Sequence, residues 1–277
     1  MQSLEVKWNK GTLALEAQML KEEQVSVPVV HRFGPGIYIR EVSFLAGTLA
    51  IGHHHTSEHV NILLKGRATM LTEDGVTWDI EAPFFYIAQP GRKVAYFYEA
   101  SVWQNIFATE ETDVDALEKQ YLVKSPVFAE SIKGFNVLKV IEDQEDFLAA
   151  IAEFGYTEDA VRELSEQTDD AVALPGGSYK FQVGDSEVEG KGLFATADIY
   201  LGDIIAPASI EGKRTIAGRY TNHAKEPNAI MVRYAGGDIS LQAIQTIRGN
   251  EGGFLGDEIT VDYRQVLALK EDTLCQV

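Results

Sequence analysis

The chain has 277 residues, 45% of them hydrophobic, and carries a formal net charge of −18 at pH 7. This composition favours folded cores over disorder, and the length suits one large domain or two ordinary ones. A chain this acidic repels a phosphate backbone, and it has no basic patch interleaved with aromatic residues. We therefore do not expect nucleic acid as a partner.

The sequence also bears on the cellular compartment. No apolar run approaches the ~20 residues that span a bilayer, and the first residues lack the continuous apolar stretch of a signal peptide. Cys275 is the single cysteine, which excludes an internal disulfide framework and a cysteine zinc cluster. We expect a soluble cytoplasmic protein that does not bind membranes.

Residues 1–125 are predicted to be β structure. Short runs rich in Val, Ile, Tyr and Phe alternate there with turns that contain Gly, Pro or Asp. Many short strands at close spacing indicate a sandwich or a barrel. The runs are IYIREVSFLAG, VNILLKG, ATMLTEDG, FFYIAQPG, KVAYFYEA and WQNIFAT.

Residues 126–173 are predicted to be an acidic helical connector. Residues 110–170 hold 17 acidic and 5 basic side chains. Apolar residues recur at helical spacing from Phe147 to Phe154, Gly155 suits a helix end, and Thr157 suits the next helix start. We expect two short helices within about residues 141–170, with their acids on the outer faces, where charge runs usually meet solvent.

Residues 174–277 return to short strands and are predicted to form a second, small β domain. Pro175, Gly176 and Gly177 mark its boundary, and strands are expected in YKFQVG, GLFATAD, DIIAPASI, AIMVRYAG, ISLQAI and EITVDYR. The glycine-rich stretch at residues 249–256 lacks the Lys-Ser/Thr ending of a phosphate loop. We expect it to be a flexible turn.

Four histidines and a glutamate gather in the stretch HHHTSEH. Because side chains alternate along a strand, His53 and His55 would share one face. Two imidazoles on one face, with Glu58 or His59 as a third ligand, suit a divalent metal such as Zn, Fe, Ni or Mn. The alternative is that these histidines are polar residues of a pocket or an interface.

The spacing from Gly47 through His53 and His55 to Gly66 resembles the first motif of the cupins, a family with a double-stranded β-helix fold. The later stretch APFFYIAQPGRKVAYF is similar to the second cupin motif, but Val94 stands where the family has its last metal-binding His. The resemblance implies a cupin-like fold for residues 1–125. It also implies weak or partial metal occupancy, and a homo-oligomer formed through this half is a further expectation.

Three stretches of the C-terminal third stand in a distinctive order: EGKGLFATADI, RYTNHAKEPNA and GDEITVDYRQ. Together they resemble the SET-domain lysine methyltransferases, which carry Gly-x-Gly-Φ-Phe-Ala, then Arg-Phe-x-Asn-His-Ser-x-x-Pro-Asn, then Gly-Glu-Glu-Leu-x-x-Asp-Tyr. The similarity covers about residues 175–265 and touches all three motifs. It implies a compact SET β-fold for residues 174–277.

The same resemblance implies S-adenosylmethionine as cofactor and a protein lysine as methyl acceptor. Asn222 would anchor the cofactor by side-chain hydrogen bonds, and His223 would bind it mainly through its backbone. Tyr263 would line the methyl-transfer channel and orient the lysine amine. The implied cofactor-binding residues are Gly190, Lys191, Gly192, Leu193, Arg219, Tyr220, Asn222 and His223.

The leading functional prediction is therefore a protein-lysine N-methyltransferase with a cupin-like accessory domain. The two-part arrangement resembles small proteins of tailed bacteriophages, so the implied target is a phage or host protein in the host cytoplasm. One alternative is a non-catalytic virion-associated or assembly protein, and another is a cupin-type metal enzyme. The interval between GDIIAPA and GRYTNH is short where larger SET proteins carry a groove-forming insert. The connector helices or the cupin-like half would then complete the substrate groove.

Overall fold

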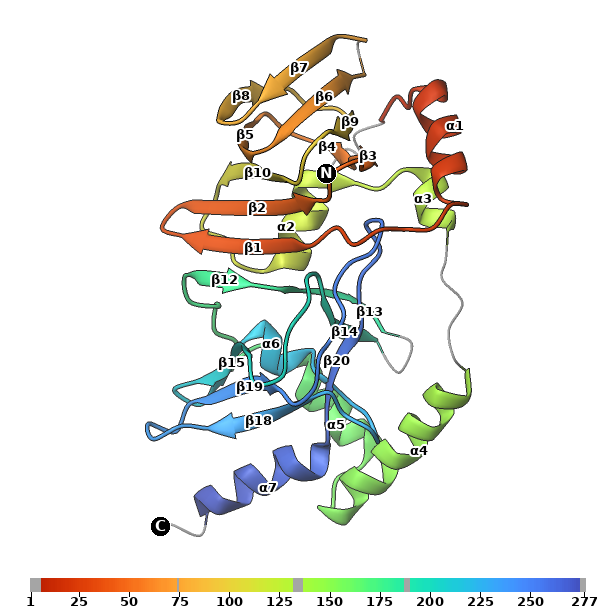
Figure 1. The fold of residues 1–277 in the computed structure, drawn as a ribbon. Coiled ribbons are helices and arrows are strands. Elements are labelled where there is room, and N and C mark those ends of the chain that lie inside the picture. Colours follow the sequence, from red (N-terminus) through yellow and green to blue (C-terminus); the bar gives the residue numbers. More distant parts are fainter. Residues whose placement is uncertain (1–5, 74, 132–136, 187–189, 275–277) are drawn as a thin grey trace.

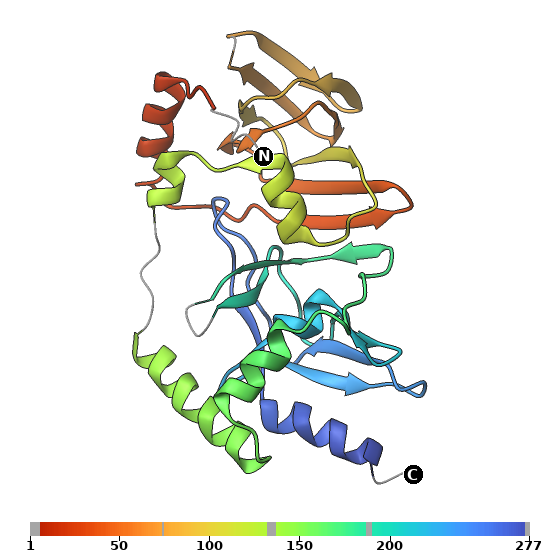
Figure 2. The ribbon, with the colours of Figure 1, turned by 180° about the vertical axis from the view of Figure 1, so that it is seen from behind.

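The computed structural model describes residues 6–73, 75–131, 137–186 and 190–274. Figure 1 and Figure 2 view the chain from opposite sides and show an N-terminal half stacked on a C-terminal half. In both views helices α4 (Val137–Glu153) and α5 (Glu158–Glu166) lie along one side of the C-terminal half. Helix α7 (Tyr263–Leu274) lies at the end of the molecule farthest from the N-terminal half.

The N-terminal half is built from two antiparallel sheets. The larger has the strand order β12-β1-β2-β10-β5-β8, the smaller has the order β3-β9-β6-β7, and β4 pairs with β11. The strands are β1 (Val29–Gly34), β2 (Ile37–Phe44), β3 (Leu49–Ile51), β4 (His54–His55), β5 (His59–Lys65), β6 (Arg67–Thr72), β7 (Thr77–Glu81), β8 (Phe84–Ala88), β9 (Lys93–Phe97), β10 (Ser101–Ala108), β11 (Leu122–Val123) and β12 (Gly177–Tyr179). The mainly β structure expected for residues 1–125 is confirmed.

Side-chain alternation explains how these sheets enclose a core. Along β10 every second residue is buried, from Ser101 to Phe107, so this strand turns one face inward along its length. A separate cluster fills the space between the two sheets. It contains Leu63, Ala68, Met70, Ile80, Ala95, Phe97 and Trp103.

Three helices lie in the described part of the first 130 residues: α1 (Lys10–Met19), α2 (Val114–Tyr121) and α3 (Pro126–Glu130). The first two fall in the segment predicted as β structure. The third lies in the predicted helical connector, ahead of the two helices expected there. The side chains of Asn9, Asp113 and Ser125 accept backbone hydrogen bonds at their N-termini, which stabilises these short helices. Helices α1 and α3 contact each other beside the sheets.

The C-terminal half contains two four-stranded sheets, with the orders β13-β14-β20-β17 and β16-β15-β19-β18. Its elements are β13 (Phe181–Asp185), β14 (Lys191–Ala195), β15 (Ile204–Ile210), β16 (Lys213–Arg214), α6 (Ile216–Arg219), β17 (Asn222–His223), β18 (Ala229–Arg233), β19 (Ile239–Ala243) and β20 (Glu258–Val261). The short strands predicted for this segment are present. One expectation was wrong: Tyr263 does not end a strand but begins helix α7.

The connector forms the two helices that the sequence predicts. Gly155 adopts φ +74 between α4 and α5, and the hydroxyl of Thr157 accepts a hydrogen bond from the N–H of Ala160. The expectation that all acids lie on outer faces was wrong. Asp143 is 4% exposed, and its Oδ1 accepts from the N–H of Lys225 in the C-terminal half.

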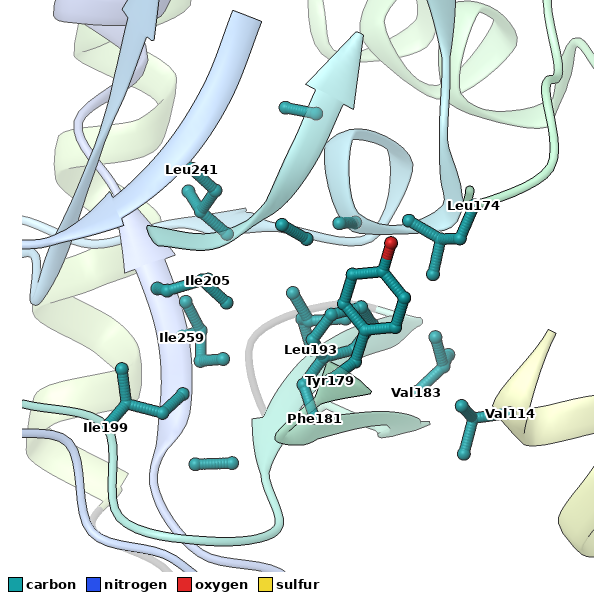
Figure 3. Packing of buried hydrophobic residues seen from close by; sticks show 14 of the residues in the cluster. Val114, Leu174, Tyr179, Phe181, Val183, Leu193, Ile199, Ile205, Leu241 and Ile259 are labelled. Carbon is teal, nitrogen blue, oxygen red and sulfur yellow. The ribbon is translucent and has the colours of Figure 1, made fainter. Parts of the chain in front are cut away.

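The two halves share a hydrophobic core, so residue 174 is not a clean boundary. Strand β12 follows residue 174 in the chain but pairs with β1 of the N-terminal half, with His31 opposite Tyr179. Figure 3 shows Val114 of α2 directed toward Val183 of β13, and both belong to one buried cluster. Fourteen members of this cluster are drawn there, among them Leu174, Phe181, Leu193 and Ile259.

None of the helices in the described part of the chain combines the length and apolarity needed to cross a bilayer.

Candidate functional site

Three segments that are far apart in the C-terminal sequence lie side by side in one sheet. Strand β14 pairs with β20 antiparallel, with Leu193 opposite Ile259. Strand β17 pairs with β20 in parallel, which sets Asn222 against Thr260 and His223 against Val261. The glycine motif, the Asn-His pair and the start of the Asp-Tyr segment therefore meet at one place.

Asn222 is half-buried in β17, beside β20 and close to β14. Its Nδ2 donates to the carbonyl oxygen of Lys191 at 3.0 Å and to Oε1 of Glu258 at 2.7 Å. A Cβ atom on Gly192 would lie 2.2 Å from that Oε1, so only glycine lets the carboxylate come this close to β14. Glu258 also accepts from the hydroxyl of Ser186 at 2.9 Å.

His223 is buried, and both of its ring nitrogens are engaged. Its Nδ1 accepts a hydrogen bond from the backbone N–H of Tyr263 at 3.1 Å, so that nitrogen carries no proton. The other nitrogen, Nε2, therefore carries the proton and donates to Oδ2 of Asp146 in α4 at 3.0 Å. Oδ2 of Asp146 also accepts a hydrogen bond from Nη1 of Arg264 at 2.9 Å. The hydrogen bonds from Arg264 hold the pKa of this carboxyl below its usual value.

Tyr263 is half-buried next to these groups. Its hydroxyl donates to the carbonyl oxygen of Thr221 at 3.2 Å, which ties the start of α7 to the turn before Asn222. The ring of Phe147 meets the Tyr263 ring edge-on, with centroids 5.8 Å apart at 73°. Helix α4 thus covers this side of the site.

Other residues of the same turn have structural contacts. The Nδ2 of Asn228 donates to the carbonyl of Glu258 at 2.7 Å, and its Oδ1 accepts from the N–H of Thr260 at 2.9 Å. These two bonds fasten the turn to β20. Leu193 is fully buried in the shared core and is paired with Val183 on one side and Ile259 on the other, so it does not face the site.

The contacts of Arg219 and Tyr220 are made with other parts of the chain and not with the Asn222 site. The guanidinium of Arg219 donates to Oδ1 of Asp170 at 2.9 Å and to the carbonyl of Ser165 at 2.8 Å, both in the connector. Tyr220 packs against the shared core. The ammonium of Lys191 is paired with Asp185 at 2.7 Å, which raises the pKa of Lys191.

Three residues of this site were not assigned a role in the sequence analysis: Asp146, Glu258 and Arg264. Glu258 lies within the motif GDEI and could have been found from it. Asp146 lies beside Phe147 and three positions after Asp143, a spacing that puts two acids near the apolar side of the helix. That spacing was the available signal.

A second candidate site lies in the N-terminal half, where His53 and His55 line a cavity of about 500 Å³. His54 faces the other way. Its ring lies 5.8 Å from that of Trp8, and its Nδ1 is 3.7 Å from Oε2 of Glu73. The predicted alternation of side chains is therefore present.

The arrangement of the remaining candidate ligands does not suit a metal ion. Glu58 is exposed and accepts from Nε2 of Gln89. The rings of His55 and His59 are stacked, with centroids 4.2 Å apart at 18°. An imidazole binds a metal through a lone pair in its ring plane, and two nearly parallel planes at this separation share no common ligand position. Within the described residues no three His, Cys, Asp or Glu side chains form a metal-binding group.

The imidazoles of this cluster are held in the neutral form. Burial, followed by the charge of Arg40, lowers the pKa of His53 to about 3. Burial also lowers the pKa of His59 to about 4, and the His59 Nδ1 lies 2.9 Å from the carbonyl of Ser57. Neutral rings can donate or accept hydrogen bonds to a ligand.

No family model matches the sequence. No curated protein matches it either. Among solved structures, a cupin-superfamily protein from Desulfitobacterium hafniense is similar over 34% of this chain and 87% of its own, at 11% identity and a TM-score of 0.26. The cupin domain of Cnp3 from Schizosaccharomyces pombe covers 36% of this chain and 72% of its own, at 17% identity and a TM-score of 0.26. KdgF from Halomonas sp. is similar over 33% of this chain and 91% of its own, at 16% identity and a TM-score of 0.26. Similarity of this extent implies no activity, substrate or metal for the present chain.

Proposed function

We propose that the C-terminal half binds S-adenosylmethionine and transfers its methyl group to a lysine of a protein partner. The observation that carries the proposal is the convergence of the three motifs in one sheet. Asn222 bonds directly to the backbone of the glycine motif, at Lys191, and Tyr263 bonds to the turn that precedes Asn222. Residues as far apart as 191 and 263 thus border one small region.

The residues at this place suit the chemistry of that cofactor. S-adenosylmethionine carries a sulfonium and an ammonium group, and the carboxylate of Glu258 lies beside Gly192, where it favours positive charge. The Oδ1 of Asn222 accepts no hydrogen bond from the described residues, which leaves it for an ammonium donor. Among the described residues no atom lies within 4 Å of where a side chain on Gly190 would begin, which leaves space there for a ligand.

The roles of the protein groups follow from their contacts. S-adenosylmethionine, when bound, supplies an electrophilic methyl carbon to an amine in an in-line displacement, so the protein acts mainly by alignment. The Tyr263 hydroxyl donates a hydrogen bond to the Thr221 carbonyl, which fixes the ring where, in this proposal, it orients the incoming amine. A lysine must lose a proton first, because its usual pKa is ~10.4. The chain from Asp146 through His223 to the Tyr263 N–H holds the tyrosine in position.

Calorimetry with S-adenosylmethionine tests the proposal. We expect Asn222→Ala to weaken cofactor binding by about 1.5–3 kcal/mol, because a side-chain hydrogen bond to a charged group is lost. We expect Tyr263→Phe to bind the cofactor normally but to release S-adenosylhomocysteine more slowly with a pool of lysine peptides. Tyr200→Phe, at an exposed tyrosine of the same half, is the matched control and should change neither value.

The alternative function predicted from sequence gives a different result. If the unaltered protein binds no S-adenosylmethionine at millimolar concentration, the proposal fails. The C-terminal half is then a non-catalytic binding module. If it binds the cofactor but Tyr263→Phe has no effect on turnover, the assigned role of Tyr263 is wrong.

A further inference from the structure

The cavity in the N-terminal half is a feature that the proposed function does not use. Its volume of about 500 Å³ is in the range of small-molecule sites. Helix α1 and helix α3 border it through Met19, Leu20 and Phe128. Most of the wall is apolar and includes Val27, Val29, Val42, Phe44, Met70, Phe97, Trp103 and Leu122.

The cavity wall holds acidic as well as basic groups. Glu16, Glu22 and Glu23 border it together with Arg40, Lys93 and the imidazoles of His53 and His55. Arg40 lies in the wall with its Nε bonded to Glu118 at 2.8 Å. Lys93 also lines the cavity, and within the described residues it forms no ion pair.

The acids in the wall are either paired or exposed to solvent. Glu16 is committed to the guanidinium of Arg92, with Oε1 at 2.6 Å from Nη2, and its Oε2 accepts from the Ser125 hydroxyl at 2.6 Å. Glu22 and Glu23 follow α1 and are exposed. Arg40 and Lys93 lie in the same wall as His53 and His55. Burial lowers the pKa of Lys93 to about 8, and the charge of nearby Glu73 partly opposes this.

We propose that this cavity binds a small carboxylate with an apolar body, held by Lys93 and the imidazoles of His53 and His55. The apolar wall takes the body of the ligand, and the ammonium with two neutral ring donors takes the carboxylate. A carboxylate fits better than a metal because the histidine rings provide hydrogen-bond donors but no common coordination position. It fits better than a cation because Lys93 would repel positive charge.

The C-terminal half contributes to the same site. Gly252 and Gly253 line the cavity, and the N–H of Gly252 donates to the carbonyl of Val25 at 2.8 Å. Both glycines have positive φ, of 55 and 84, which lets this loop fold against α3. A ligand in the cavity therefore contacts both halves of the chain and stabilises the contact between them.

Titration calorimetry on the full chain tests the proposal with 4-phenylbutyrate and its neutral counterpart, 4-phenylbutanol. We expect the acid to bind about tenfold more tightly or better, because a hydrogen bond to a charged group is typically stronger by that amount. We expect Lys93→Gln to reduce the affinity for the acid to that for the alcohol. Lys213→Gln, at an exposed lysine in the C-terminal half, should leave both affinities unchanged.

The comparison of acid with alcohol on the unaltered chain holds even if Lys93→Gln does not fold. Equal affinities for the two probes would overturn the proposal, as would no binding of either probe at millimolar concentration. Stoichiometric binding of Zn²⁺, Fe²⁺ or Ni²⁺ that is lost in His53→Ala would also overturn it and would identify a metal centre. These outcomes are independent of S-adenosylmethionine binding, so this inference and the proposed function fail separately.

Discussion

At the scale of single residues, buried neutral histidines govern how acid acts on this protein. His31 is fully buried in β1, and its Nδ1 is 2.7 Å from the hydroxyl oxygen of Tyr38. Burial, and then the charge of Arg40, lowers the pKa of His31 from 6.5 to about 3. The proton that an unfolded histidine binds near pH 6.5 is therefore not bound by the folded protein until about pH 3.

We predict that the free energy of unfolding falls as the pH drops below 6.5. In that range the unfolded state binds a proton at residue 31 that the folded state does not, so each pH unit costs about 1.4 kcal/mol for this histidine. His31→Gln has no ring to titrate, and its stability should fall less steeply between pH 6 and 4, by about that amount per unit. Urea denaturation at several pH values measures the slopes.

Tyr38→Phe is the matched control for this experiment. It removes the hydroxyl that bonds to His31 but keeps the ring, so its stability should be lower at every pH while the slope stays steep. If His31→Gln shows the same slope as the unaltered protein, then His31 does not contribute to the acid sensitivity.

At the scale of elements, helix α4 is docked by acids that a sequence pattern assigns to solvent. Asp146 accepts from His223 and from Arg264, and Glu153 accepts from Nε of Arg264 at 2.9 Å. Phe147 adds an aromatic contact to Tyr263. Helix α4 is thus attached to His223 and Tyr263, which both border the proposed methyl-transfer site.

We predict that Asp146→Ala loosens α4 from the C-terminal half. The buried Nε2–H of His223 would lose its acceptor, which costs about 1–3 kcal/mol. Amide hydrogen exchange should speed up in α4 and at the Tyr263 N–H, whose acceptor is the same histidine. Mass spectrometry of deuterium uptake measures both.

Glu145→Ala changes the neighbouring, exposed acid of the same helix and should leave exchange unchanged. Because hydrogen bonds to Arg264 lower the pKa of Asp146, the contact contributes stability above the usual aspartate pKa and loses it as the pH falls through the lowered value. Equal exchange in Asp146→Ala and Glu145→Ala would contradict this account of docking.

At the scale of the whole molecule, the two halves behave as one structural unit. The shared cluster joins Leu117 of α2 to Phe181 and Val183 of β13, all buried. The ring of Phe254, in the loop before β20, stacks on that of Phe128 with centroids 4.7 Å apart. Contacts of this kind couple the unfolding of one half to that of the other.

We predict a single unfolding transition for the whole chain. All three tryptophans, Trp8, Trp78 and Trp103, lie in the N-terminal half, so their fluorescence follows that half. Circular dichroism at the helix band includes α4, α5 and α7 of the connector and C-terminal half. The two denaturation curves should coincide, as two-state unfolding requires.

Leu117→Ala should lower both curves together by about 2–5 kcal/mol, because it leaves a cavity in the shared core. Ile80→Ala, in the core between the N-terminal sheets, is the comparison. Two separated transitions, with Leu117→Ala shifting only the fluorescence curve, would mean that the halves fold independently.

The sequence by itself determined the elements with strong local patterns. Alternating apolar residues identified most strands of both halves, and the periodicity around Phe147 with Gly155 and Thr157 identified α4 and α5. These features depend on neighbours in the chain, so a single sequence contains them. The His53 and His55 alternation was readable for the same reason.

Only the tertiary structure decided which of these features meet. The pairing of β12 with β1, the docking of Asp146 on His223 and the Glu258 carboxylate beside Gly192 all join residues that lie far apart in the chain. The outward turn of Glu58 and the stacking of His55 on His59 also depend on the packing around them, and both weaken the predicted metal site. Spacing along a chain sets which face a side chain takes, whereas its partners are set by the packing of whole sheets and helices.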